Sequence, residues 1–122
     1  MWRGKMPKSE HGEFDDAKKS AFSIEYYDSS WELEYMKELE SDPKVAKWTK
    51  NHGLQIKYFD DEGKFRTFKP DFLVEMVDGT KELHEMKGTH LLDNPITRRK
   101  VDKAREWCKN RGMSFRIISK YQ

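Results

Sequence analysis

Hydrophobic and polar residues follow two different periods along this chain, and together they predict a mixed α/β (α+β) domain. A helical period covers residues 29–40 and ends before Asp42-Pro43, because a residue that precedes proline disfavours the helical conformation. A second helix is predicted from Pro95 to about residue 110, with Gly112 suited to its C-terminal stop. Shorter runs that favour strands cover residues 54–59, 64–68, 72–77, 81–87 and 113–119, with a short extended piece at 45–48. The expected order is α-β-β-β-β-α-β, with a mixed central sheet flanked by helices.

The first 22 residues lack both periods, and basic and acidic side chains are mixed there with scattered apolar ones. Chain termini are poorly ordered unless something holds them, so we expect residues 1–22 to form an arm that is flexible or docks late. Residues 23–122 have the length of one domain, and we expect a single domain there.

Composition narrows the class of protein. The chain has 122 residues, of which 38% are charged and 35% are hydrophobic, so we expect a small core and an ionic surface. No apolar run approaches the roughly 18 residues that span a bilayer, and no secretory signal follows Met1, so a cytoplasmic location is expected. A single cysteine, Cys108, excludes a disulfide framework and a multi-cysteine zinc site. With 24 basic and 22 acidic residues, the net charge does not by itself indicate a nucleic-acid partner.

Candidate chemistry lies on the two central predicted strands. Asp71 opens the most apolar run, and Glu85 and Lys87 close the run that returns after Asp78-Gly79. Side chains alternate along a strand, so Glu85 and Lys87 share one face. Two carboxylates can hold Mg²⁺, and a neighbouring lysine can assist an attacking water and neutralise developing charge. The alternative is that these are ordinary solvated charges in a charge-rich chain.

The turn between these two strands decides whether the side chains meet. A strict two-residue turn would put Asp71 on the face opposite Glu85 and Lys87. We therefore predict a three-residue turn, with residue 77 pairing with residue 81, or a bulge. Either arrangement would place Asp71 beside Lys87.

Glu32 is a further candidate, because it lies within the apolar stripe of the first predicted helix. That stripe consists of Trp31, Leu33, Tyr35, Met36 and Leu39. A carboxylate on an apolar face needs a partner, which can be a cap, a lysine or a metal. Glu32 either completes a capping box with the amide of Ser29, or binds a metal directly or through water.

These residues, taken in order, resemble the PD-(D/E)XK nuclease superfamily. The motifs that carry the resemblance are Ser29-x-x-Glu32, Val45-x-x-Trp48, Pro70-Asp71-Phe72-x-Val74 and Glu85-Met86-Lys87-Gly88, followed by Lys100 and Ala104-x-x-Trp107-Cys108. Within the superfamily they are similar to TnsA-type transposon endonucleases and to the nuclease domain of type III restriction subunits. The residues also resemble the small head-completion nucleases of tailed phages.

The resemblance implies a restriction-endonuclease-like core and a specific set of roles. Asp71 and Glu85 would bind metal, Lys87 would be the catalytic lysine, and Glu32 would bind metal directly or through water. The implied reaction is Mg²⁺-dependent hydrolysis of a DNA phosphodiester bond, with Mn²⁺ expected to substitute. No Walker motif is present, so ATP hydrolysis is not expected from this chain.

Basic residues gather at the start and middle of the second predicted helix. They are Arg98, Arg99, Lys100 and Lys103. A helix N-terminus adds amide donors for phosphate, so we expect this cluster to contact DNA. The alternative is a solvated helix face.

One active site per chain would nick a single strand, so a homodimer or a larger partner is expected for a double-strand cut and for target recognition. Two other functions stay open at this stage. One is a catalytically silent nucleic-acid-binding or assembly subunit with a nuclease fold, and the other is a purely structural subunit.

Overall fold

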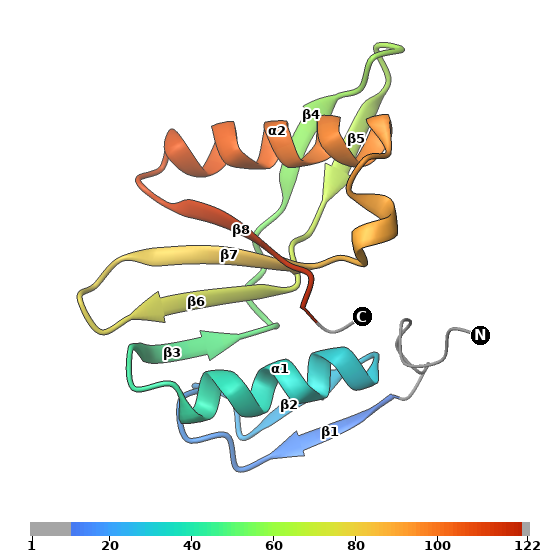
Figure 1. Ribbon diagram of the computed structural model, residues 1–122. Coiled ribbons are helices and arrows are strands. Elements are labelled where there is room, and N and C mark those ends of the chain that lie inside the picture. Colours follow the sequence, from blue (N-terminus) through green and yellow to red (C-terminus); the bar gives the residue numbers. More distant parts are fainter. Residues whose placement is uncertain (1–10, 121–122) are drawn as a thin grey trace.

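The computed structural model describes residues 11–120, and its centre is a four-stranded sheet (Figure 1). In order across the sheet, the strands are β3 (Val45–Thr49), β6 (Phe72–Met76), β7 (Lys81–Met86) and β8 (Ser114–Ile118). The first three pair antiparallel, whereas β8 runs parallel to β7. A parallel neighbour requires a crossover, which the second helix supplies. The predicted mixed α/β class is confirmed.

The two helices lie on opposite sides of this sheet (Figure 1). α1 (Ser30–Ser41) and the sheet enclose one apolar core, which includes Met36, Trp48 and Phe72. α2 (Pro95–Lys109) and the sheet enclose the other, which includes Leu83 and Ala104. A short 3-10 helix, η1 (Thr89–Leu91), joins β7 to α2.

The helix boundaries follow from local capping chemistry. The Ser29 hydroxyl accepts the Glu32 amide hydrogen at 3.2 Å at the start of α1. At the start of α2, the side chain of Asn94 accepts from the Ile96 amide, and Pro95 occupies the first turn. Gly112 follows α2 with a φ of 69°, a left-handed conformation that favours glycine.

Two separate two-stranded ribbons accompany the central sheet. β1 (Gly12–Asp15) pairs with β2 (Ile24–Tyr27), and β4 (Ile56–Phe59) pairs with β5 (Phe65–Phe68). The β4–β5 ribbon lies beside α2 and projects beyond it (Figure 1). The runs at 54–59 and 64–68 are therefore strands as predicted, but they stand outside the central sheet. Its edge is instead formed by the short extended piece at 45–48.

Part of the arm expected over residues 1–22 is packed on the domain. The ring of Phe14 lies edge-on to Trp48, with the ring centroids 5.9 Å apart. The Trp48 amide donates to the carbonyl of Lys19 at 3.1 Å, which satisfies one backbone group on the edge of β3. Residues 1–10 lie outside the described residues.

The three-residue turn predicted between β6 and β7 is confirmed, but its position differs from the expected one. Residue 77 does not pair with Lys81, because Glu75 is the partner of Lys81. The loop therefore consists of residues 77–79.

Local hydrogen bonds explain this position of the turn. The Met76 amide donates to the carbonyl of Thr80 at 2.8 Å and closes the loop. One oxygen of Asp78 accepts from both the amide and the hydroxyl of Thr80. Gly79 has a φ of 90°, so the residue that tolerates a left-handed conformation comes last in the loop.

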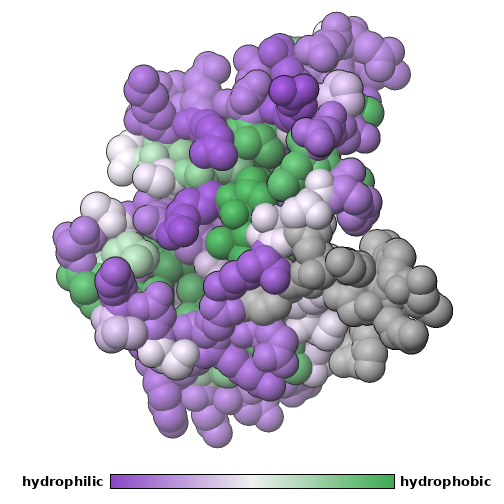
Figure 2. Space-filling model, viewed as in Figure 1, coloured by the Kyte–Doolittle hydropathy of each residue, from purple (hydrophilic) through white to green (hydrophobic). Residues whose placement is uncertain are grey.

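The surface is mostly hydrophilic in the view of Figure 2, with hydrophobic residues visible between α2 and the central sheet. Neither helix in the part of the chain that the structure describes is long and apolar enough to cross a membrane.

Candidate active site

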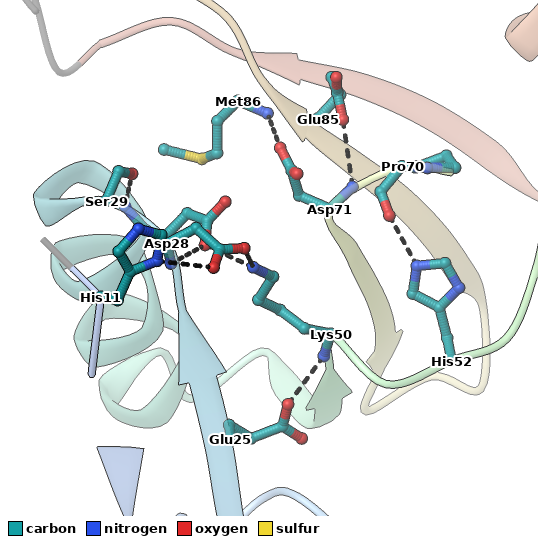
Figure 3. Close-up of polar contacts among 11 residues, drawn as sticks. His11, Glu25, Asp28, Ser29, Lys50, His52, Pro70, Asp71, Glu85 and Met86 are labelled. Atoms are coloured by element: carbon teal, nitrogen blue, oxygen red, sulfur yellow. Dashed lines mark hydrogen bonds and ion pairs between the residues drawn. The ribbon is translucent and has the colours of Figure 1, made fainter. Parts of the chain in front are cut away.

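Asp71 and Glu85 meet at the end of the β6–β7 hairpin, and each holds the backbone of the other strand (Figure 3). The Asp71 amide donates to Glu85 Oε1 at 3.1 Å, and the Met86 amide donates to Asp71 Oδ2 at 2.8 Å. Continuing the pairing of Phe72 with His84 by one residue puts Asp71 opposite Glu85. The expectation that Asp71 would lie beside Lys87 is therefore wrong, because the turn is centred one residue earlier than predicted.

Burial makes this carboxylate pair electrostatically unfavourable. Glu85 is only 8% exposed. Burial, followed by the negative charge of Asp71, raises the pKa of Glu85 to about 9, although Lys87 acts in the opposite direction. A divalent cation bound to both carboxylates would remove this penalty, because it favours their ionised forms.

Lys87 lies on the same face as Glu85, as the strand alternation predicted. Its Nζ is 3.7 Å from Glu85 Oε2, and its side chain is largely buried. The Lys87 amide donates to the carbonyl of Ile118 at 3.0 Å, so the end of β7 is fixed by the last strand of the sheet.

Lys100 comes close to the same group of residues from α2. Its ammonium lies 4.4 Å from the centroid of the Phe68 ring. Burial and the charge of Lys87 lower the pKa of Lys100, while Glu85 and Asp71 act in the opposite direction. Lys100 was predicted from sequence as a DNA contact, and the structure adds that the charges of the candidate site affect its pKa.

The other members of the basic cluster have different surroundings. Arg98 is exposed and Lys103 is half-buried. Arg99 forms an ion pair with Asp61 of the β4–β5 loop, with Nε 3.2 Å from Oδ1. The structure thus leaves Arg98 open to solvent and engages Arg99 within the protein.

Glu32 is buried on the core side of α1, as the helical wheel predicted, and is 8% exposed. Its Oε1 accepts from the Asp28 amide at 2.8 Å and lies 2.5 Å from the Nζ of Lys50. Glu32 therefore accepts a backbone hydrogen bond at the start of α1, as the capping alternative predicted. The donor is the amide of Asp28, however, and not the expected amide of Ser29. Burial raises the pKa of Glu32, Lys50 opposes this, and the charge of Asp71 adds to it.

Lys50 follows β3 and bridges two carboxylates. Its Nζ lies 3.0 Å from Asp28 Oδ2 as well as 2.5 Å from Glu32 Oε1 (Figure 3 labels Lys50 and Asp28). Burial alone would lower the pKa of Lys50, but the two carboxylates together raise it. Glu32 thus carries its own counter-charge within the fold.

His52 supports the backbone that precedes Asp71 (Figure 3). Its Nδ1 accepts from the Leu54 amide at 3.0 Å, so the ring donates from Nε2 to the carbonyl of Pro70 at 2.7 Å. Burial lowers the pKa of His52, which favours this neutral form.

The donor set of the site fits a small hard cation only in part. Among the described residues, no three His, Cys, Asp or Glu side chains surround a common position suited to a metal. Asp71 and Glu85 converge, whereas Glu32 is engaged by Lys50. Two carboxylates are nevertheless a sufficient protein contribution for Mg²⁺, since that ion keeps several water ligands.

Sequence reasoning did not single out Lys50 and His52. Both lie directly after the Val45-x-x-Trp48 motif, between two motifs that were recognised. Nothing in the pattern distinguishes Lys50 from the other 23 basic residues, because its partners come from a different part of the chain.

His84 and Cys108 behave as structural residues. The ring of His84 bridges the hydroxyl of Tyr35 and the carboxylate of Glu82 at 2.6 and 2.8 Å. Cys108 is fully buried, and burial raises the pKa of its thiol to about 11. These values favour core packing over nucleophilic chemistry.

Comparison with known families gives one result. Residues 42–120 match the family described as TnsA-like endonuclease N terminal. The matched segment includes Asp71, Glu85 and Lys87 but begins after Glu32. A comparison with curated proteins gives no match.

Proposed function

Since this chain belongs to the TnsA-like endonuclease N-terminal family, we propose that it is a metal-dependent endonuclease that hydrolyses phosphodiester bonds in DNA. The observation that carries the proposal is the contact between Asp71 and the buried Glu85, where burial and the charge of Asp71 oppose ionisation of Glu85. A carboxylate pair that is unfavourable by itself is typical of a site that binds a cation. Mg²⁺ suits these oxygen ligands, and Mn²⁺ would substitute.

The chain's own residues have distinct roles in this proposal. Asp71 and Glu85 would hold the metal ion, which would supply Lewis-acid chemistry toward water and the phosphate. The ammonium of Lys87 orients the attacking water and neutralises charge that develops on the phosphate. Glu32, which is already engaged by Lys50, would help to orient the metal from the α1 side through water, without binding it directly.

The DNA would approach over the start of α2. Arg98, Arg99, Lys100 and Lys103 supply positive charge there, and Lys100 links this surface to the carboxylates. If three or four phosphates are contacted, the logarithm of affinity should fall with the logarithm of salt with a slope of about −0.9 per contact. A second copy of the chain or a larger partner would supply the second strand cut and target recognition.

Cleavage of supercoiled plasmid tests the proposal directly. The wild-type chain is incubated with Mg²⁺ or Mn²⁺, and with EDTA as the metal-free control. We expect Asp71→Asn and Lys87→Met each to lower the rate by about 100-fold or more, because each removes a group that acts in the transition state. Glu75→Gln, near the far end of the strand that Asp71 precedes, is the matched control and should cleave normally.

Two results would contradict the proposal. Unchanged cleavage by both variants would mean that the site lies elsewhere. Retention of DNA without cleavage, on duplex, single-stranded and branched substrates, would identify the chain as a silent binding or assembly subunit.

A further inference from the structure

Lys50 is held more rigidly than a surface lysine. Its side chain is 16% exposed, and that of Glu32, its nearer partner, is 10% exposed. Its backbone amide donates to Glu25 Oε1 at 3.0 Å, and Glu25 is itself 2% exposed. Lys50 is therefore fixed at both its backbone and its ammonium end.

The ammonium contacts two carboxylates, and carboxylate oxygens are also ligands that Mg²⁺ prefers. It lies between one oxygen of Asp28 and one oxygen of Glu32, at 3.0 and 2.5 Å. The same oxygen of Glu32 also accepts from the Asp28 amide, so the nearest acceptor on this side is already used twice. A divalent ion could bind Glu32 only by displacing the ammonium, since both would compete for the same lone pairs.

The two sides of the site therefore differ in their need for a cation. Lys87 lies 3.7 Å from one oxygen of Glu85, and Lys100 acts on Glu85 and Asp71 through its charge. Asp28 and Glu32, in contrast, have Lys50 in direct contact with both. Among the described ion pairs, a single ammonium therefore bridges Asp28 and Glu32, whereas none bridges Asp71 and Glu85.

We propose that the Lys50 ammonium is a resident cation that takes the place of a second divalent ion, so that the chain binds one divalent ion, at Asp71 and Glu85. Lys50 is on this account a positioning residue that acts through Glu32. The inference rests on the proposed function, because it assumes a metal site at Asp71 and Glu85.

The test counts the bound ions and does not depend on catalysis. Mn²⁺ is titrated into the full chain and followed by calorimetry and by the electron paramagnetic resonance signal of unbound Mn²⁺. Wild type should bind one ion per chain. Lys50→Met should bind a second ion with an affinity at least about tenfold higher than any second binding in wild type. The double variant Lys50→Met with Glu32→Gln should again bind one ion per chain.

Matched variants separate charge from folding. Lys47→Met changes an exposed lysine on the same segment and should keep a count of one. Lys50→Arg keeps the charge and should also keep a count of one. Lys50→Gln preserves a polar side chain where methionine impairs folding, and it should gain the second ion; circular dichroism verifies the fold of every variant.

The outcomes distinguish this inference from the proposed function. The role of Lys50 would be overturned if wild type bound two ions, or if folded Lys50→Met and Lys50→Gln bound only one. In either case, Asp71-dependent binding and DNA cleavage would still support the proposed function. Absence of Mn²⁺ binding in wild type, with no effect of Asp71→Asn, would overturn the proposed function and this inference with it.

Discussion

Two carboxylate pairs of similar composition lie on neighbouring parts of this molecule, and they differ in how their charge is balanced. Asp28 and Glu32 share the ammonium of Lys50. Asp71 and Glu85 hold each other's strand backbone, and burial with mutual repulsion raises the pKa of Glu85 to about 9. The first pair has its own bridging ammonium, whereas the cost of ionising the second is relieved by protonation of Glu85 or by an added cation. Burial of acidic groups therefore does not by itself indicate a cation site; the two pairs differ in whether an ammonium bridges them.

The largest effect on folding is expected from removing the balancing charge. Lys50→Met leaves Glu32 buried without its cation and should lower the free energy of unfolding by about 3 kcal/mol, as for other broken buried ion pairs. Urea denaturation measures this. Lys47→Met, an exposed control on β3, should change stability by less than about 0.5 kcal/mol.

A double variant checks the cause of that loss. Lys50→Met with Glu32→Gln removes both charges, so it should recover most of the lost stability. If the double variant is as unstable as Lys50→Met alone, packing of the lysine stem rather than charge balance is responsible.

The second effect is stabilisation by metal. A divalent ion that binds only the folded chain adds about 2.7 kcal/mol at a concentration 100 times its Kd. Mg²⁺ or Mn²⁺ should therefore raise the Tm of wild type, measured by circular dichroism. Asp71→Asn should abolish most of the shift, and an equal shift in that variant would contradict metal binding at this pair.

The third effect is a gain in stability, whereas removing the charge of Lys50 lowers stability. In metal-free buffer, Glu85→Gln should raise stability by about 1–2 kcal/mol, the order of cost for a poorly compensated buried polar group. The pKa of Glu85 is raised in the folded chain, so its contribution is present below pH 4.5 and is lost as the pH rises to about 9. The advantage of Glu85→Gln should thus grow between pH 5 and pH 9 in thermal melts. An advantage that is constant with pH would point to packing instead.

The smallest effect concerns the support of Asp71 by His52. Burial lowers the pKa of His52 below 6.5, so its contribution to stability is present above that pH and is lost as the pH falls. His84 adds a loss of the same sign, because burial lowers its pKa as well. Urea midpoints between pH 5 and pH 7 should fall less steeply in His52→Gln than in wild type. Parallel profiles would show that His52 does not titrate in this range.

Most of the fold follows from local patterns in the sequence. The helix at Ser29 and the helix at Pro95 were predictable because their caps and their periods agree. Placement of the 54–59 and 64–68 runs outside the central sheet was not predictable, because local propensity describes a strand but not the sheet that it joins.

Only one part of the candidate site, that of Asp71, Glu85 and Lys87, was predictable from the sequence. Asp71, Glu85 and Lys87 lie on two strands joined by a short turn, so strand alternation and turn length decide their proximity. Even there the register depended on the Asp78 side chain, which sets the position of the loop. Lys50 meets Glu32 through packing of α1 against the end of β3, and a contact across 18 residues has no period that would reveal it.

The hydrogen bond from the Lys87 amide to the Ile118 carbonyl has a consequence for the order of assembly. The ribosome makes Asp71, Glu85 and Lys87 well before it makes β8, yet the end of β7 acquires its backbone partner only when β8 is added. A nascent chain that extends only through α2 holds every proposed catalytic side chain without a fixed position for the lysine. The proposed DNA-cleaving activity would therefore appear only late in synthesis, after all of the proposed catalytic residues have been made.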